Sequence, residues 1–513
     1  MGCDDYPMLS SDRELFLDAA SKGANFIPVA NSWSADLETP LTTWLKVGHG
    51  RPPGVLLESV EGGERVGRWS VVAFNPLWTA TARGNRLRRE WRDGRNDQSL
   101  GNPFEQLKQW IAPYRPIRNP DLPPLGQLYG IWGYELIQWI EPTVPIHSRE
   151  EAGPPDGVWM LMDSILIFDQ VKRLITAVAY GDLTKNQSPE IAYENALERI
   201  HNLESLMAEP LPVVNPLRWQ DNNVSTPKTK RNFRKSDFEG AVKKAKKHIA
   251  AGDVFQLVLS QKFETRVDKH PFELYRSLRM VNPSPYMAFF DFGDWQLIGS
   301  SPEVMVKAEP TQDGIRASLR PIAGTRPRGR NEQEDLKLAE DLLSDPKECA
   351  EHVMLVDLGR NDLGRVCKAG SVAVKELMVI EKYSHVMHIV SEVDGLLDPE
   401  KDVLDLLMAS FPAGTVSGAP KIRAMQLIHE LETQSRGPYS GVYGSLDLNG
   451  ALNTAITIRT MVVRGHPQGG WLMQVQAGAG VVADSVPTSE YQETLNKARG
   501  MLTALAALGS PKT

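Results

Sequence analysis

Two short segments, far apart in the chain, each place a pair of glutamates on one face of an expected helix. The first pair is Glu348 and Glu351, and the second pair is Glu490 and Glu493. A helix turns about 100° per residue, so residues three positions apart project from the same side. Carboxylate oxygens are the ligands that Mg²⁺ prefers in proteins. The spacing is therefore typical of two helices that hold one divalent cation between them.

The neighbours of both pairs allow a second interpretation. His352 is expected on the same face as Glu348, and Lys497 on the same face as Glu493. Asp345 stands where a helix N-cap would, and Glu348 would then be the third residue of its capping box. Most carboxylate pairs on helices are solvated surface groups, so the pattern alone favours this structural interpretation.

Periodicity also indicates the elements that position these side chains. A helix that begins at Pro487 has an apolar stripe opposite its acids. The stripe consists of Tyr491, Leu495, Ala498 and Leu502. Earlier in the chain, Ser236 and Glu239 indicate a capping box that opens a helix running to Ala251.

The order of strands and helices predicts the α+β class. Strands are expected at 254–263, 441–448, 454–463 and 471–477, and Asn449-Gly450 is a hairpin signal. A meander beside helices favours a layered sandwich of antiparallel sheets with helices packed outside, and disfavours a doubly wound parallel sheet. A stretch rich in Pro, Asn, Thr and Lys indicates a linker. The expected domains are a tail (1–20), an N-terminal region with a regulatory site (21–209), the linker (210–235) and a catalytic domain (236–510).

Composition excludes several classes of function. The 513 residues carry a net charge of −7, which provides no basic surface for nucleic acid. Asp163 and Asp169 interrupt the longest apolar run before it reaches the length of a membrane span. The three cysteines fit neither a disulfide framework nor a zinc site, and the N-terminus lacks the apolar core of a signal peptide. We therefore expect a cytoplasmic protein without nucleic-acid or membrane partners.

A glycine-rich segment, Gly478-Ala479-Gly480, follows the strand expected at 471–477 and fits part of the dinucleotide-binding fingerprint. That fingerprint requires a helix that opens at once within a parallel unit, whereas Pro487 intervenes and the neighbouring strands are expected to be antiparallel. Glycines before a helix can still present backbone N–H groups to an anion. The structural alternative is a tight turn at the end of the strand.

Four segments, in the same order, resemble those of the chorismate-utilising enzymes: 321–329, 351–358, 416–421 and 476–482. The resemblance covers nearly the whole chain and is greatest to the aminating large subunits of anthranilate synthases. It implies a magnesium-dependent conversion of chorismate and ammonia to anthranilate and pyruvate, the first committed step of tryptophan biosynthesis. Because the chain ends at Thr513, soon after its last expected helix, we expect ammonia to come from glutamine through a separate amidotransferase subunit, in a heterodimer or heterotetramer.

The resemblance also implies roles for individual residues. Glu351 and Glu493 would be the metal ligands, and Glu490 would support them. Glu348 matches the family's candidate general acid, and His388 matches a histidine near the hydroxyl group that leaves. The expected catalytic residues are Glu348, His388, Gln256 and Lys497. The residues expected to bind chorismate are Gly324, Thr325, Tyr439, Arg459, Gly478, Ala479 and Gly480.

Chorismate is a dianion, so its site needs cationic and hydrogen-bonding groups. Arg459 provides a planar fork that suits a carboxylate. Alternation along the strand expected at 454–463 places Arg459 on the same face as Thr457, away from the more apolar side. The resemblance adds Tyr439 at the same carboxylate, and a turn at 321–325 beside the substrate.

Two positions distinguish relatives within the family. Isochorismate and salicylate synthases carry a lysine base where this chain has Gln256, whose neutral amide cannot take a proton. Aminodeoxychorismate synthases typically carry a nucleophilic lysine where this chain has Ala323. Both positions favour anthranilate as the product. The alternatives are an aminodeoxychorismate synthase component I of the folate pathway, and a non-catalytic subunit that binds chorismate or tryptophan.

Two further segments, 56–59 and 282–287, resemble the halves of the family's feedback site for tryptophan. The resemblance implies that an L-tryptophan inhibitor binds there. The residues expected to contact it are Ser59, Pro285, Tyr286 and Met287. The structural alternative is a buried strand with a proline turn packed against it. The stretch 60–70 differs from the best-studied relatives and assigns no lysine to this site.

Overall fold

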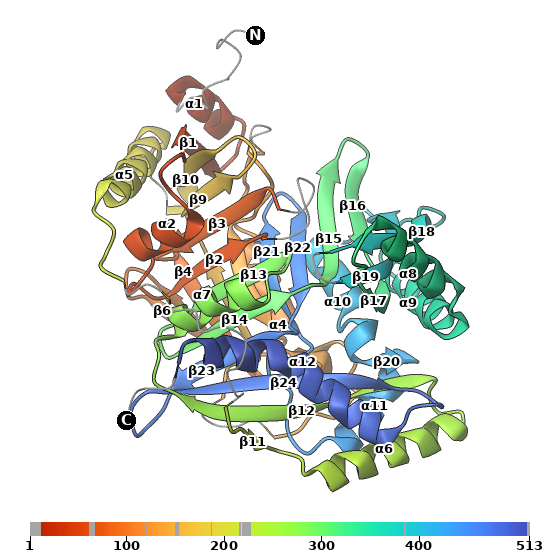
Figure 1. Ribbon diagram of the computed structural model, residues 1–513. Coiled ribbons are helices and arrows are strands. Elements are labelled where there is room, and N and C mark those ends of the chain that lie inside the picture. Colours follow the sequence, from red (N-terminus) through yellow and green to blue (C-terminus); the bar gives the residue numbers. More distant parts are fainter. Residues whose placement is uncertain are drawn as a thin grey trace.

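The computed structural model contains two large antiparallel sheets with helices on their outer faces (Figure 1). It describes residues 12–60, 67–118, 122–148, 153–185, 187–214, 217, 227–383 and 386–509. Within these ranges, every helix is too short or too polar to cross a membrane. The architecture confirms the predicted α+β sandwich of antiparallel sheets.

The first sheet combines strands from both ends of the chain. In spatial order its strands are β1 (Phe26–Ser34), β10 (Leu174–Asp182), β9 (Ser164–Asp169), β3 (Trp69–Phe74), β2 (Gly54–Glu58), β13 (Tyr286–Asp291), β14 (Trp295–Ser301), β23 (Thr460–Gly465), β24 (Trp471–Val481), β12 (Gln256–Val267) and β11 (Lys230–Arg231). The short strand β20 (Gly418–Ala419) also pairs with β12.

The second sheet likewise combines strands from both halves of the chain. Its order is β17 (Ile322–Pro327), β19 (Val386–Leu396), β16 (Gly314–Leu319), β15 (Val304–Thr311), β22 (Ala451–Ile456), β21 (Val442–Asp447), β7 (Leu128–Trp132), β8 (Gly157–Leu161), β4 (Trp78–Arg83), β5 (Arg86–Trp91) and β6 (Asn96–Leu100). Strand β18 (Ala373–Lys382) pairs with β19.

Helices cover the outer faces of this sandwich. The α-helices are α1 (Arg13–Ser21), α2 (Pro40–Val47), α4 (Pro103–Ile111), α5 (Pro189–Ala208), α6 (Lys235–Ala250), α7 (Pro271–Val281), α8 (Glu332–Ser344), α9 (Pro346–Gly364), α10 (Val403–Ser410), α11 (Lys421–Leu431) and α12 (Pro487–Ala507). The described residues also form the short 3₁₀ helices η1 (Tyr134–Trp139), η2 (Leu183–Lys185) and η3 (Gly414–Val416).

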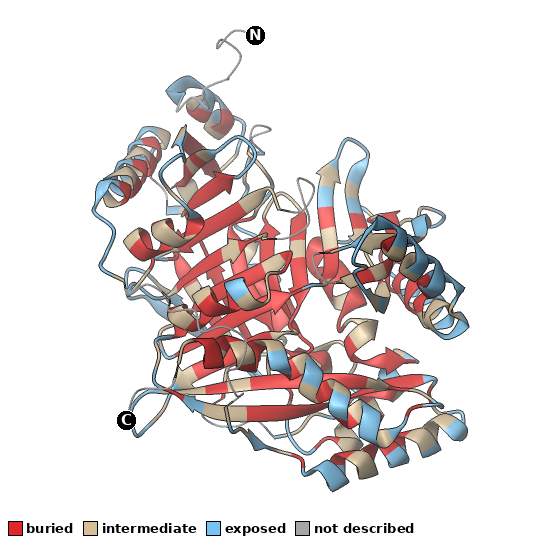
Figure 2. Cartoon of the chain, viewed as in Figure 1, coloured by how far each residue is buried: buried red, intermediate tan, exposed pale blue. Residues whose placement is uncertain are grey.

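Strand alternation divides the core into two layers. In β13, Ala288 and Phe290 face the core between the sheets, whereas Phe289 faces the helices α2 and α7. The same alternation holds in β3, where Val71 and Val72 point to opposite layers. Figure 2 shows buried residues along the strands of both sheets, with exposed residues on the outer sides of the helices.

Both sheets contain strands from before and from after the linker expected at 210–235. Strand β2 pairs with β13, and β7 pairs with β21, so the N-terminal and C-terminal parts share each sheet. Residues 215–216 and 218–226 of the linker, and residues 1–11 of the expected tail, lie outside the described ranges. The rest of that tail contains most of helix α1. The division into domains stays a prediction.

Several predicted boundaries differ from the observed ones. Helix α6 begins at Lys235, and its N-cap Arg234 makes no side-chain capping bond, so the predicted capping box at Ser236 is wrong. The helix ends at Ala250, one residue before the predicted end at Ala251, and Gly252 follows with φ +84°. The hairpin predicted at Asn449-Gly450 is confirmed between β21 and β22.

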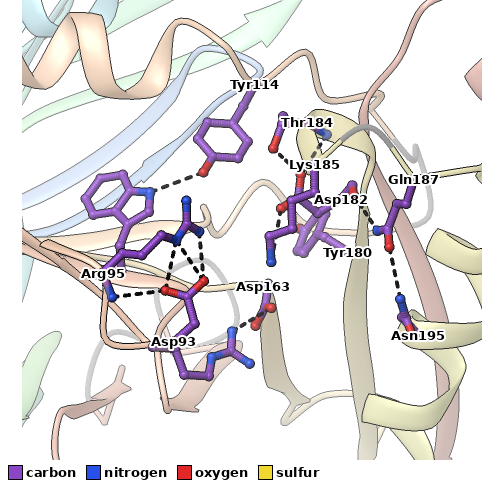
Figure 3. Close-up of polar contacts among 12 residues, drawn as sticks. Asp93, Arg95, Tyr114, Asp163, Tyr180, Asp182, Thr184, Lys185, Gln187 and Asn195 are labelled. Atoms are coloured by element: carbon purple, nitrogen blue, oxygen red, sulfur yellow. Dashed lines mark hydrogen bonds and ion pairs between the residues drawn. The ribbon is translucent and has the colours of Figure 1, made fainter.

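A polar cluster ties the N-terminal strands to helix α5 (Figure 3). Arg92 forms a 2.6 Å ion pair with the buried Asp163. Gln187 donates to the carbonyl oxygen of Asp182 at 2.6 Å and accepts from Asn195 of α5 at 3.1 Å. These contacts fix α5 against β10, and none of these residues lines the cavities described below.

Candidate active site

A cavity of about 480 Å³ lies where the first sheet faces the second. Strands β12 and β24 form one wall, and β17 and β19 form another. Helix α9 contributes Glu351 to the lining, and helix α12 contributes Lys497. The cavity thus joins both sheets to the two helices that carry the paired glutamates.

The cavity brings together many of the residues singled out in the sequence. Those that line it are Gln256, Thr325, Glu351, His388, Tyr439, Arg459, Gly478 and Lys497. Others lie within two residues of a lining residue or on the same two helices, without lining the cavity. They are Gly324, Glu348, Ala479, Gly480, Glu490 and Glu493.

Arg459 is placed by a break between two strands. The prediction of one strand over 454–463 is wrong, because β22 ends at Ile456 in the second sheet and β23 begins at Thr460 in the first. Arg459 lies in this crossover with φ +51°, a left-handed conformation to which strand alternation does not apply. The amide of Ser300 donates to the carbonyl oxygen of Arg459 at 3.1 Å and holds the crossover. The arginine therefore reaches the cavity at the point where the chain changes sheets.

The guanidinium of Arg459 is prepared for an anionic ligand. Burial lowers the pKa of Arg459, although Tyr439 and Glu493 partly oppose this effect. Among the described residues, no carboxylate lies within ion-pair distance of this guanidinium. A partly buried arginine without an ion-pair partner can bind a ligand carboxylate through two parallel hydrogen bonds.

The segment 478–480 lies inside β24, so the alternative of a tight turn at the strand end is wrong. Gly478 pairs with Ser260 of β12, and Gly480 pairs with Val258. The amides of Ser260 and Val258 donate away from β24. In an antiparallel pair of this kind both residues direct their N–H groups outward. The amides of Gly478 and Gly480 therefore point away from β12, on the side where β23 no longer pairs.

Neighbouring side chains pack closely on these two glycines. A Cβ atom on Gly478 would lie 2.6 Å from the hydroxyl of Tyr439, and one on Gly480 would lie 2.7 Å from Nε2 of Gln256. A side chain at either position would therefore force the tyrosine hydroxyl or the glutamine amide to move. On the outward side of Gly478, Lys497 Nζ donates to the carbonyl oxygen at 3.0 Å. Tyr439, Gln256 and Lys497 thus all pack onto the same stretch of strand.

His388 is held by β17. The turn expected at 321–325 is a strand with a bulge at Gly324, which has φ +70°. Nδ1 of His388 lies 2.9 Å from the carbonyl oxygen of Gly324 and 3.1 Å from Oγ1 of Thr325. Burial lowers the pKa of His388, so the neutral imidazole dominates at neutral pH. Its contact with a carbonyl oxygen indicates that Nδ1 carries the proton.

Two of the helical glutamates lie near the start of α9 and the other two near the start of α12. Gln256 Nε2 donates to Glu351 at 3.0 Å. Burial and the charge of Glu351 raise the pKa of Glu348, and burial also raises the pKa of Glu490. The charge of Lys347 lowers both of these pKa values, against the larger effect of burial.

Such a group of acids suits a hard divalent cation. Within the described residues, however, no three His, Cys, Asp or Glu side chains come close enough to hold a metal on their own. A cation at this position would therefore need oxygen ligands from a bound substrate or from water.

His352 does not project with Glu348 and Glu351, so that expectation is wrong. Its side chain is fully buried, and Nε2 lies 2.6 Å from Oγ of Ser391 in β19. Asp345 does cap α9 as expected, because its side chain accepts from the amides of Lys347 and Glu348. The buried stripe expected opposite the acids of α12 is also present.

Glu303 is a functional candidate that sequence reasoning missed. It lines the cavity and accepts a 2.9 Å hydrogen bond from Thr415. Burial raises the pKa of Glu303 to about 7, against the opposing effects of Thr415 and Lys497. A signal was available in the sequence, because Glu303 follows Pro302 at the junction of two apolar strands. Acidic residues are rarely buried, so an acid between two apolar strands stands out as an unusual position.

A second cavity, of about 240 Å³, lies between the sheets on the other side of the segment 283–287. Ser59, Pro285, Tyr286 and Met287 line it, and Pro285 also lines the first cavity. Ser59 Oγ donates to the carbonyl oxygen of Pro285 at 2.7 Å. Pro285 is therefore part of a wall that the two cavities share.

The side chains of the neighbouring strand residues point elsewhere. Glu58 is buried and accepts from Tyr275 and from Arg279 on helix α7. Met287 belongs to the helix-facing layer of the core. Their backbone, rather than the Glu58 carboxylate or the Met287 thioether, therefore faces this cavity. Tyr286 packs against the layer between the sheets.

Comparison with known proteins finds relatives that match almost the whole chain. The family of chorismate binding enzymes matches residues 54–503. Anthranilate synthase component 1 of Synechocystis is 55% identical over 98% of this chain and 100% of its own length. The protein of the same name from Aquifex aeolicus is 43% identical over 94% of this chain and 96% of its own length.

Solved structures agree with these relatives. The crystal structure of anthranilate synthase component I from Streptococcus pneumoniae superimposes with a TM-score of 0.72 at 38% identity, covering 91% of this chain and 98% of that one. The isochorismate synthase MenF from Escherichia coli shares the fold, with a TM-score of 0.66 at 19% identity over 96% of this chain and 98% of that one. This chain therefore belongs to the chorismate-binding enzymes and, within them, to the anthranilate synthase component I family.

Proposed function

We propose that this chain aminates chorismate to anthranilate as the large subunit of an anthranilate synthase. The observation that carries the proposal is the cavity itself, in which the unpaired cation of Arg459 faces the same space as Glu303, Glu351 and His388. Such a site suits a dianion that must lose a hydroxyl group. The reaction adds ammonia at ring carbon 2, releases the hydroxyl of carbon 4 as water, and then eliminates pyruvate to give the aromatic ring.

Substrate binding is assigned to groups on three walls. Arg459 and Tyr439 bind the enolpyruvyl carboxylate, and the outward amides of Gly478 and Gly480 donate to the same anion. Support comes from the close packing of Tyr439 on Gly478, which fixes the phenol beside these amides. Gly324 and Thr325 belong to the opposite side of the site, where they also orient His388.

Glu351 and Glu493 are the proposed ligands of Mg²⁺, and Glu490 supports them. The bound ion would orient the ring carboxylate and neutralise its charge. Support comes from the raised pKa values of the adjacent Glu348 and Glu490, which reflect burial and crowding of like charges. Gln256 holds Glu351 in place and supplies no base.

Two carboxyls are candidates for the acid that protonates the leaving hydroxyl. Glu348 is the candidate from family resemblance, but it does not line the cavity. Glu303 lines the cavity and has a pKa of about 7, so a large fraction is protonated at neutral pH. A general acid works best when its pKa lies near the working pH. We therefore assign the acid to Glu303, with His388 as a neighbouring hydrogen-bonding group.

A separate amidotransferase subunit is the proposed source of ammonia. The relatives bear the name component 1, which supports a second component.

The cavity beside Ser59 is the proposed feedback site for tryptophan, in keeping with the first committed step of tryptophan biosynthesis. Its small size and its shared wall at Pro285 support a regulatory ligand that acts on the active site.

The deciding experiment is to incubate the purified chain with chorismate, Mg²⁺ and ammonium, and to identify the aromatic product. Anthranilate is expected, and glutamine should not replace ammonium until an amidotransferase subunit is added. Accumulation of 4-amino-4-deoxychorismate would instead identify the folate-pathway alternative. Absence of any product from an otherwise folded chain that binds chorismate would support the non-catalytic alternative.

A further inference from the structure

A buried ion pair between Arg436 and Glu432 lies behind the wall of the active-site cavity. The two side chains are only 1% and 5% exposed. Nε and Nη2 of Arg436 donate to the two carboxylate oxygens of Glu432 at 2.9 and 2.6 Å. Burial opposes ionisation of Arg436, but Glu432 raises the pKa of Arg436 above its ordinary value. Arg436 therefore stays charged in the interior.

The remaining donors of Arg436 reach three separate segments. Nη1 donates to the carbonyl oxygen of Val416 at 2.8 Å and to Oγ of Ser440 at 3.0 Å. Nη2 also donates to the carbonyl oxygen of Val258 at 2.7 Å. Together with the bonds to Glu432, these contacts use all five N–H groups of the guanidinium. Val258 and Val416 both line the cavity.

The same guanidinium holds the loop that carries Tyr439. Arg436 lies over the ring of Tyr439, 5.5 Å from its centroid. The next residue, Ser440, has φ +64°, a strained conformation that persists only when neighbouring groups hold it. The bond from Arg436 and the bond from the Ser440 amide to Thr457 hold it here. Tyr439 is thereby fixed with its hydroxyl against Gly478.

Glu432 holds a further part of the wall. One of its oxygens accepts from both the amide and the hydroxyl of Ser260 at 2.8 Å. The Ser260 hydroxyl in turn accepts from Gln476 at 2.8 Å, and Gln476 lines the cavity. The pair thus connects β12, β24, η3 and the loop before β21.

We propose that Arg436 and Glu432 are positioning residues for chorismate, which lock Tyr439 and the surrounding walls into the geometry that receives the substrate carboxylate. The inference rests on the proposed assignment of this cavity to chorismate. An ion pair that served the fold alone would contribute to stability without changing ligand affinity. Here one guanidinium is the shared hydrogen-bond donor of two wall segments and the Tyr439 loop, so its geometry sets the shape of the site.

The test is calorimetric titration of the chain with chorismate and Mg²⁺, without ammonium, so that binding is measured apart from turnover. Arg436→Lys keeps the charge but replaces a rigid five-donor fork by a flexible three-donor ammonium. We expect Kd to rise at least about tenfold, the ratio that one hydrogen bond to a charged group provides. Arg89→Lys is the matched control, because Arg89 forms a similar fork to Asp97 far from the cavity. Its Kd should match that of the wild type.

Ser440→Gly keeps the inference testable if Arg436→Lys does not fold. Glycine adopts φ +64° without strain, so the melting temperature should change little while the bond from Arg436 is lost. We expect a Kd at least about threefold higher, from loss of part of one such bond. In the ammonium assay, the rise in KM should be larger than the fall in kcat, since the lost contacts orient bound substrate.

Wild-type Kd in folded Ser440→Gly would overturn the inference, as would wild-type Kd in folded Arg436→Lys. A wild-type chain that binds chorismate but forms no anthranilate would overturn the proposed function alone.

Discussion

Replacing Glu303 by glutamine keeps the shape of the side chain but removes the proton that a carboxylic acid can donate. If Glu303 protonates the leaving hydroxyl, turnover should fall by about 10²- to 10⁴-fold, the range in which general acid catalysis contributes. The KM for chorismate should change little, because Arg459 and the glycine amides are untouched. The Thr415 hydroxyl can still donate to the amide oxygen of the variant.

The same substitution should change stability in a pH-dependent way. The pKa of Glu303 is about 7 in the folded chain, against an ordinary value of 4.5. At 1.36 kcal/mol per pH unit, this difference corresponds to about 3 kcal/mol. A raised carboxyl pKa means that the folded state binds the proton more tightly than the unfolded state. The stabilisation is therefore complete below pH 4.5 and is lost as the pH rises through 7. Glutamine lacks this pH dependence.

Two measurements check the reasoning. Thermal melting of both forms from pH 5 to pH 8.5 should show the Glu303→Gln variant gaining stability relative to the wild type as the pH rises, up to about 3 kcal/mol. The wild-type rate with saturating ammonia should decline above pH 7, and Thr415→Val should move that decline upward by removing a bond that lowers the pKa of Glu303. A variant with more than a third of wild-type turnover, or a stability difference that is constant with pH, would refute the assignment.

Three further predictions concern the remaining groups of the two cavities. Glu351→Gln and Glu493→Gln should each reduce magnesium-dependent turnover by at least about a hundredfold, and near-normal activity in a titration with Mg²⁺ would return both helices to the solvated interpretation. Arg459→Lys should raise the chorismate KM about tenfold or more by losing the carboxylate fork, and an unchanged KM would show that the anion binds elsewhere. Ser59→Phe should fill the second cavity and relieve inhibition by tryptophan many-fold, within the ~1–3 kcal/mol typical of allosteric coupling, with uninhibited turnover retained. Superimposable inhibition curves would mean that this cavity is only core packing.

The helices of the site could be predicted from the sequence because their signals are local. Asp345 and Pro346 define the start of α9, and the apolar stripe of α12 fixes which side faces the core. Periodicity failed at His352, which lies one residue, or about 100°, beyond Glu351 and so falls on the buried side. The face of a helix that a borderline position occupies depends on how the helix is rotated against its neighbours.

The crossover at Arg459 could not be predicted because the sequence around it is continuous in character. Residues 454–463 alternate and are rich in β-branched side chains, which fit one strand as well as two. What separates them is the presence of two sheets at this point, a tertiary fact. Glu303 was missed for a related reason. Its place between two apolar strands is visible in the sequence, but the packing around the acid decides whether its charge is buried.

The sharing of both sheets between the two halves of the chain has a consequence for synthesis on the ribosome. Strand β2 is complete at residue 58, but its partner β13 begins at residue 286. At about 5–20 residues per second, the missing partner is made roughly 10 to 50 seconds later. Strand β7 waits longer still for β21, which begins at residue 442.

During that interval, the nascent N-terminal half carries two apolar strand edges with unpaired backbone groups, a form prone to pair with other chains. A fragment that ends before residue 210 should therefore aggregate when made alone. It should become soluble when residues 227–513 are supplied in the same cell, since only they complete its sheets. The yield of folded enzyme would then be limited by the time for which the N-terminal half is alone, and not by the stability of the finished sandwich.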